Sequence, residues 1–174
     1  IACPAAERQQ QQEELRQYVH DTGGGLIMIG GPNSFGTVAG LIANGWNNGN
    51  WAGLGIRSSL GTSGTFAVGY GEASNVFGIS GAGTATFQGQ TVDATSALVL
   101  FTLFGDADLS RRVDLNDFTR LAANFGFTGQ LWTEGDFNYD GTVGIADFSI
   151  LAANFNVALP AAGASGWSMS VISA

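Results

Sequence analysis

The sequence contains no lysine, and its six arginines are outnumbered by 14 acidic residues, so the net charge of the 174-residue chain is −8. Nucleic acids and anionic membrane surfaces are bound by clustered basic side chains, and this charge balance argues against both partners. No apolar run approaches the roughly 18 residues that a membrane-spanning helix requires. The composition therefore disfavours three broad classes of function before any motif is considered.

Cysteine and histidine are almost absent too. The single Cys3 excludes a disulfide within the chain. His20 is the only histidine, which leaves almost no material for a Ser-His-Asp triad or a histidine-based zinc site. Only 11% of the residues are charged and 27 are glycine, a composition closer to β-rich extracellular chains than to cytosolic enzymes.

The most informative feature present is a twelve-residue segment that occurs twice. Residues 106–117 read DADLSRRVDLND, and residues 136–147 read DFNYDGTVGIAD, 30 positions later. Each copy runs into a similar tail, DFTRLAANFG or DFSILAANFN, in which seven of ten positions are identical. Chance does not copy a loop and its tail together, so the two copies are expected to form equivalent structures.

Oxygen-bearing side chains occupy positions 1, 3, 5 and 12 of both copies. This spacing is the ligand pattern of an EF-hand-type calcium loop, because a hard dication is surrounded by about six to eight oxygens. Gly141 stands at position 6 of the second copy, where the chain turns sharply, whereas Arg111 stands there in the first. We expect the second loop to bind calcium more strongly, and Val113 and Val143, at position 8, to pair the two loops. The alternative for each loop is a solvated acidic turn.

Residues 104–156 resemble a type I dockerin repeat, in which two calcium loops ending in Asp are each followed by one short helix. Gly105 and Gly135 precede the loops and make an entering helix implausible. The resemblance implies calcium-dependent folding, an extracellular setting and often a docking role. The calcium ligands that it implies are Asp136, Asn138, Asp140, the carbonyl of Thr142 and Asp147 in the second loop, and Asp106, Asp108, Ser110, the carbonyl of Arg112, Asp114 and Asp117 in the first.

From residue 37 onward the chain divides into three parts. Residues 37–104 read as a Gly-rich β segment that opens with a short helix and ends with a strand at 97–104. Residues 105–156 form the calcium module, and residues 157–174 are a tail. We therefore predict an α+β fold, in which the Gly-rich β segment is followed by a small two-helix module.

Residues 1–36 predict one helix, from about Ala5 to His20, and one buried parallel strand at 26–29. The stretch GGGLIMIGGPNSFG resembles a fragment of von Willebrand A-like or amidotransferase-like α/β domains. The glycines lack the spacing of a phosphate-binding loop, so we read them as a strand-end turn. The neighbouring parallel strands of such domains are missing, and we expect a loosely attached piece joined near Gly36 by fusion or truncation.

Other candidate sites are weaker. An aromatic set could stack on sugars or simply pack in the core: Trp46, Trp51, Tyr70, Trp132 and Trp167. Glu72 and Asp93 could act as paired carboxylates in glycoside hydrolysis, although no hydrolase motif flanks them. The two LAANF segments place Leu121, Ala122 and Phe125, and Leu151, Ala152 and Phe155, on helical stripes. We expect these stripes to pack the two helices on each other.

These observations predict a non-catalytic, calcium-binding, dockerin-like module of a secreted or cell-surface bacterial protein, in a setting such as polysaccharide breakdown. Its partner would be a cohesin-like or other surface protein. Type I dockerins favour a Ser-Thr pair at loop positions 10 and 11, where this chain has Leu115-Asn116 and Ile145-Ala146, so the partner would differ from a conventional cohesin. The alternatives are a calcium-stapled structural terminus, or a fragment of a carbohydrate-active enzyme that lacks its catalytic domain.

Overall fold

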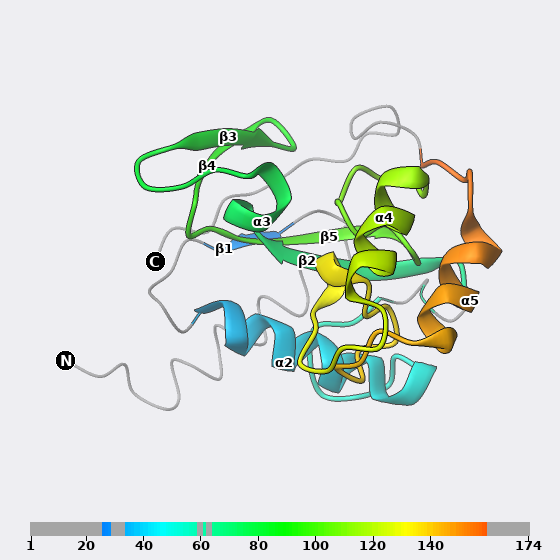
Figure 1. The fold of residues 1–174 in the computed structure, drawn as a ribbon. Coiled ribbons are helices and arrows are strands. Elements are labelled where there is room, and N and C mark those ends of the chain that lie inside the picture. The colour runs from blue at the N-terminus through cyan, green and yellow to red at the C-terminus, as the bar shows by residue number, and fades with distance from the viewer. Residues whose placement is uncertain (1–25, 29–33, 59–60, 62–63, 160–174) are drawn as a thin grey trace.

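A computed structural model of the chain describes residues 26–28, 34–58, 61 and 64–159. It confirms a mixed α+β fold built on two small antiparallel sheets (Figure 1). In the first sheet, β5 (Ala97–Leu103) lies between β1 (Leu26–Met28) and β2 (Phe66–Glu72). The second is a hairpin of β3 (Thr84–Phe87) and β4 (Gln90–Asp93).

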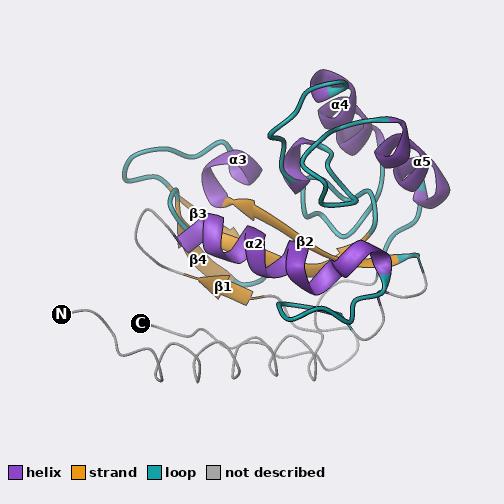
Figure 2. Cartoon of the chain, turned by 90° about the horizontal axis from the view of Figure 1, so that it is seen from below, coloured by secondary structure: helices purple, strands orange, loops and turns teal. Residues whose placement is uncertain are grey.

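The helices surround the three-stranded sheet. Helix α2 (Ser34–Trp46) runs along one face of the sheet (Figure 2), and the short α3 (Ala73–Phe77) follows β2 directly. Helices α4 (Leu115–Asn124) and α5 (Ile145–Asn154) gather with their loops at the end of the sheet away from the hairpin. Short 3-10 turns, η1 (Asn47–Gly49) and η3 (Trp132–Glu134), complete the described elements.

Strand β5 explains why the sheet forms where it does. All seven of its residues are buried, as expected for a central strand that is apolar except for Thr102 and has a neighbouring strand on each side. β5 ends at Leu103, and the chain continues through Gly105 into the first acidic loop, so the predicted strand before that loop is confirmed. One hydrophobic core continues from the sheet into the module and includes Ile42, Leu100 and Trp132. The pair of acidic loops is therefore packed on the sheet and shares its core.

The structure changes the interpretation of the N-terminal piece. The predicted parallel strand is wrong, because β1 pairs antiparallel with β5, in the register Ile27 with Leu98. The expectation of loose attachment is likewise wrong for residues 26–28, since β1 covers the edge of β5 that β2 leaves free. Helix α2 runs through the expected junction at 36/37 and includes the predicted short helix. The helix expected between residues 5 and 20 lies outside the described residues.

The two repeats exchange their backbone partners. Val113 of the first loop donates to the carbonyl of Val157, beyond α5, over 3.0 Å, and Val143 of the second donates to that of Phe127, beyond α4, over 3.1 Å. The expected direct pairing of Val113 with Val143 is therefore wrong. Each loop instead pairs with the segment that follows the helix of the other repeat, so neither repeat is complete alone.

The same exchange explains the glycine before each loop. Gly105 and Gly135 have φ angles of +100° and +108°, a region where a Cβ is strained. A Cβ at Gly135 would lie 2.8 Å from Cα of Leu121 in α4, and one at Gly105 would lie 3.0 Å from Cα of Leu151 in α5. Each helix thus crosses directly over the glycine of the opposite repeat.

Gly135→Ala is expected to lower the free energy of unfolding by about 1–3 kcal/mol more than Gly129→Ala. Gly129 also has a positive φ, +74°, but its Cβ would meet nothing within 4 Å, so that variant carries the backbone strain alone. Urea denaturation of both variants in calcium-containing buffer makes the comparison. Equal losses would show that α4 does not approach Gly135 this closely.

Candidate metal centre

The first aspartate of each loop holds the chain in a tight turn. Asp106 is fully buried, and its two carboxylate oxygens accept hydrogen bonds from the backbone N–H groups of Ser110 and Arg111, both at 2.9 Å. Asp136 accepts in the same way from Asp140 and Gly141, at 3.1 and 3.0 Å. Positions 1, 5 and 6 therefore make equivalent hydrogen bonds in the two loops.

The last aspartate of each loop closes the ring from the helix side. Asp117 is buried in the first turn of α4 and accepts from the N–H groups of Ala107, at 2.8 Å, and Asp114, at 2.8 Å. Asp147 repeats both bonds in the second loop, from Phe137 at 2.8 Å and Gly144 at 2.9 Å. The position-12 carboxylate thereby ties the beginning of its loop to the start of the helix that follows.

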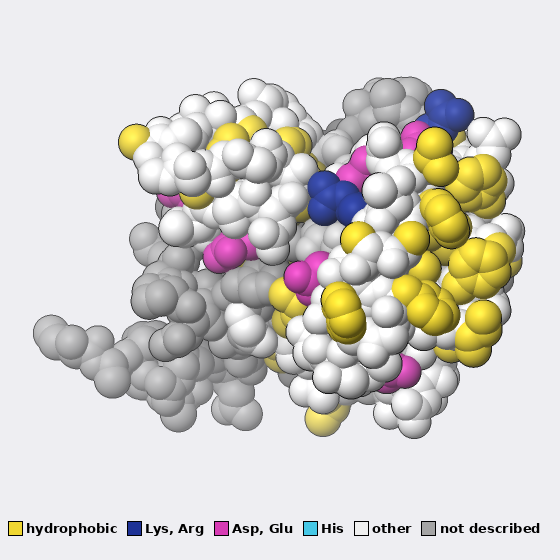
Figure 3. All heavy atoms as spheres, in the orientation of Figure 1, with side chains coloured by type: hydrophobic (Ala, Val, Ile, Leu, Met, Phe, Trp, Pro, Cys, Tyr) yellow, Lys and Arg dark blue, Asp and Glu magenta, His cyan; other side chains and the backbone are white. Residues whose placement is uncertain are grey.

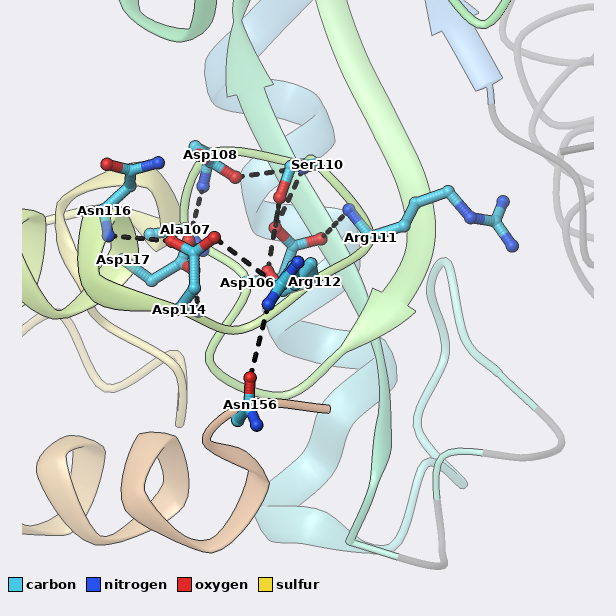
Figure 4. A network of polar contacts seen from close by, with 10 residues as sticks. All are labelled: Asp106, Ala107, Asp108, Ser110, Arg111, Arg112, Asp114, Asn116, Asp117 and Asn156. Atoms are coloured by element: carbon cyan, nitrogen blue, oxygen red, sulfur yellow. Dashed lines mark hydrogen bonds and ion pairs between the residues drawn. The ribbon is translucent and has the colours of Figure 1, made fainter. Parts of the chain in front are cut away.

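Three carboxylates converge in the first loop. Asp106, Asp108 and Asp117 each offer an oxygen, and the three oxygens lie within 4.8 Å of one another (Figure 4). Two of the three side chains are buried and one is partly buried. A set of hard oxygen donors at this spacing fits a metal ion such as calcium, magnesium or manganese. This acidic triad could therefore hold a metal ion.

The second loop reaches a similar arrangement with an amide at position 3 and a carboxylate at position 5. Position 3 is Asn138, whose Oδ1 accepts from the N–H of Asp140 at 3.0 Å and whose Nδ2 donates to Asp140 at 2.8 Å. Asp140 also accepts from the N–H of Thr142 at 2.8 Å. The acidic triad belongs to the first loop, although sequence reasoning ranks the second loop higher. That ranking stays a prediction.

The remaining expected ligands lie at the rim of the first loop. Ser110 is exposed, and its hydroxyl donates to the carbonyl of Arg112 at 3.3 Å. Asp114 caps helix α4 by accepting from the N–H of Asn116 at 2.8 Å, and it lies 3.7 Å from Nε of Arg112. Asp114 is thus occupied by the helix terminus and stands outside the acidic triad.

Burial sets the electrostatics of the loops. It raises the pKa of Asp106 well above the ordinary value, and the charges of Asp117 and Asp108 raise it further, against the hydrogen bond from Thr102. Burial likewise raises the pKa of Asp117 to about 6 and that of Asp136 to about 7. Crowded buried carboxylates favour a bound proton or a bound cation, because either one neutralises the charge.

Arg111 is the clearest departure between the loops. Its φ is +67°, whereas Gly141 at the same position has +82° and no Cβ. Burial lowers the pKa of Arg111, an effect that Asp106 opposes, and its Nε is buried without a partner in the described part of the chain. The first loop therefore carries backbone strain and a poorly solvated cation that the second loop avoids.

Two contacts to the first loop were not anticipated from the sequence. Thr102 of β5 donates its hydroxyl to Asp106, and Trp132 of η3 donates Nε1 to the carbonyl of Asp106 at 2.7 Å. Both come from outside the twelve-residue segment, so loop spacing could not reveal them. An indication was available only for Thr102, which is a polar residue within an otherwise apolar strand.

The helical stripes pack only in part as expected. Leu121 and Leu151 are buried, but Ala122 and Ala152 are exposed, and Phe125 and Phe155 are each 49% exposed. The expectation that the whole stripe packs between the helices is therefore wrong for these alanines and phenylalanines. Each helix turns a single leucine toward the glycine of the opposite repeat, which leaves the neighbouring aromatic side chains outside.

The other candidates lose support. Trp51, Tyr70 and Trp132 are buried in one aromatic cluster with Tyr139, which favours core packing over a sugar platform. Asp93 accepts from the hydroxyls of Ser96 and Thr95, bonds that lower its pKa, whereas a general acid needs a raised one. Glu72 lies at the end of β2, on a different strand from Asp93 of β4, and accepts a hydrogen bond from the hydroxyl of Ser74. Cys3, His20 and Trp167 lie outside the described residues.

No family model matches the chain, and searches of curated proteins and of solved structures find no significant match to it. None of the helices in the described ranges is long and apolar enough to cross a membrane.

The stability of the metal-free protein is expected to fall as the pH rises from about 4 to about 7. An unfolded aspartate titrates near 3.9, while Asp117 and Asp136 titrate at about 6 and about 7 in the folded state. The folded protein therefore binds more protons than the unfolded chain in this interval, and the stability that these protons contribute is lost as they dissociate. Denaturation in metal-depleted buffer across this range measures the slope. Stability that rises with pH would contradict these shifts.

Arg111→Gly is expected to strengthen metal binding by the first loop, because it relieves the positive-φ strain and removes a cation close to the carboxylates. The matched control is the reverse change, Gly141→Arg, whose Cβ meets nothing within 4 Å and which should weaken the second loop. Isothermal titration with calcium compares both with the parent protein. Weaker binding by Arg111→Gly would mean that the first loop is misaligned.

Proposed function

We propose that the chain is a calcium-ordered, dockerin-like docking module of a secreted or cell-surface bacterial protein, with no catalytic role of its own. The observation that carries this proposal is the repeated apolar face beside the metal loops. Its members come in equivalent pairs from the two repeats, and we call them the docking face: Leu115 and Ile145, Phe118 and Phe148, Phe125 and Phe155.

The docking face is unusual for its exposure. Leu115 and Ile145 are 65% and 71% exposed, and the rings of Phe118 and Phe148 meet edge to face across the two helices at 6.5 Å. Figure 3 shows hydrophobic side chains gathered over this side of the molecule. Contiguous apolar surface of this kind is typical of sites where another protein binds.

A metal ion in the acidic loops would control the docking face. Asp117 and Asp147 lie in the first turns of α4 and α5 and close the two loops. A calcium ion on these carboxylates would fix how each helix leaves its loop, and the exchanged backbone pairs would fix one repeat against the other. Calcium would thereby order the surface that a partner recognises.

The apolar residues of the docking face indicate what kind of surface a partner would present. Positions 10 and 11 of the loops are Leu115-Asn116 and Ile145-Ala146, with no Ser-Thr pair. A matching surface would be largely apolar and would receive two nearly equivalent aromatic pairs. A cohesin-like protein with an apolar recognition surface, or another surface protein of that character, fits these residues.

A second candidate function is supported by the hydrogen bond from Thr102 of β5 to Asp106 and by the core shared between sheet and module. Both observations suit a calcium-stapled structural terminus. In that case calcium would stabilise the entire fold without preparing a surface for any partner. The two functions share the metal and differ in what the docking face does.

The metal arm of the test is a calcium titration by calorimetry and circular dichroism. Asp136→Asn is expected to remove or greatly weaken one site, because a buried carboxylate is lost from the ligand set. Asp93→Asn makes the same chemical change in the β4 turn, away from the loops, and should bind like the parent protein. Absence of both heat and spectral change at millimolar calcium would refute the calcium proposal.

The docking arm compares capture of secreted proteins from the same source, with calcium and with a chelator. Phe118→Ser combined with Phe148→Ser is expected to abolish calcium-dependent capture while leaving calcium binding intact. Phe77→Ser is the control, because Phe77 is 38% exposed, close to the 37% and 39% of Phe118 and Phe148, but lies on α3. A calcium-stabilised protein that captures nothing in any form would favour the structural terminus.

A further inference from the structure

A cleft of about 330 Å³ lies between α3 and α4, with η3 contributing to its lining. Its polar lining includes Asn75 of α3, Arg120 and Asn124 of α4, and Thr133 and Glu134 of η3. The space-filling view shows a hollow between the lobe that carries the β3–β4 hairpin and the lobe that carries α4 and α5 (Figure 3). The cleft is separate from the acidic loops and from the docking face.

Arg120 is the chemical centre of this cleft. Its guanidinium reaches the carbonyl of Asn75 at 3.5 Å from both terminal nitrogens and the carbonyl of Thr133 at 3.4 Å. All three contacts are long beside the usual 2.9 Å of such bonds. Among the described residues Arg120 makes no ion pair, which is notable in a chain of net charge −8. Its fork of N–H donors is thus only weakly engaged.

The lining supplies a second, independent observation. Thr133 is 2% exposed, and its hydroxyl oxygen has no hydrogen-bond partner in the described part of the chain. The methyl group of Thr133 faces Gly71 of β2, where a Cβ would come within 2.4 Å of it. Buried hydroxyls are nearly always satisfied, so Thr133 is an unusual polar group in the wall of this cleft.

We propose that this cleft binds a small hydrophilic molecule through a carboxylate group held by the guanidinium of Arg120. A planar carboxylate matches the arginine fork and forms two short, charge-assisted hydrogen bonds in place of the three long ones. The volume suits a molecule of about monosaccharide size, at the lower end for small-molecule sites.

The other side chains narrow the ligand class. Glu134 lies on the lining and is fixed there by accepting from the N–H of Leu131 at 2.8 Å. Its negative charge opposes a dianion such as phosphate more strongly than a singly charged carboxylate, and its carboxylate can accept hydrogen bonds from hydroxyl groups. Asn75 and Asn124 add amide groups to the lining. A singly charged, hydroxyl-rich carboxylate is the chemistry that fits all of these groups.

The test compares glucuronate with glucose, which share their ring and most hydroxyls and differ in the carboxylate. Both are titrated into the calcium-saturated full chain, with the amide resonances of residues 119–124 and 133–134 followed by NMR. Glucuronate is expected to give saturable chemical-shift changes at millimolar concentration. Glucose is expected to bind with an affinity at least about tenfold lower, since a charged hydrogen bond is worth about that factor. Equal affinity for the two sugars, or no shift with glucuronate, would overturn the proposal.

Arg120→Gln should lower glucuronate affinity at least about tenfold, to the level of glucose. Arg57→Gln is the control, because Arg57 is exposed and does not line the cleft. If Arg120→Gln fails to fold by circular dichroism, Arg120→Lys keeps the charge but loses the fork, and should bind several-fold more weakly than the parent. Unchanged glucuronate affinity in a folded Arg120 variant would also overturn the proposal.

Discussion

The carboxylate of Asp106 is buried where strand β5 becomes the first loop, and much of the module is arranged around it. The carboxylate accepts hydrogen bonds from backbone N–H groups of the loop on one side and from the hydroxyl of Thr102 in the sheet on the other. The backbone carbonyl of Asp106 accepts a further hydrogen bond from the indole N–H of Trp132. A lone buried charge costs several kcal/mol unless it is neutralised. The site therefore needs a proton or a cation, and the acidic triad supplies the donors for the latter.

Reciprocity between the repeats is the second organising constraint. Each helix crosses the glycine of the opposite loop, and each loop pairs with the segment after the opposite helix. A disturbance in one repeat is therefore transmitted to the other through backbone contacts. The same reciprocity aligns Phe118 with Phe148, so the docking face depends on both repeats at once.

Much of the module could be predicted from the sequence, because its information is local. Spacing located the loops and the aspartates at positions 1 and 12, and the resemblance to a dockerin repeat added the short helix after each loop, since these features depend on a few consecutive residues. The exchange of Val113 and Val143 partners could not be predicted, because alternation along one loop does not reveal which distant segment supplies the partner. The antiparallel β1 was missed for the same reason: a short apolar run has no direction of its own.

The pairing of the first loop with residues beyond α5 has a consequence for the order in which the chain becomes structured. Asn156 and Val157 bond to the backbone of Val113, and Leu159 bonds to that of Arg111. During synthesis, the first loop, which ends at residue 117, is made 39 residues before the first of these partners, Asn156. The first loop cannot form these backbone hydrogen bonds during that interval, so its native structure is completed only after the segment that follows α5 has been made.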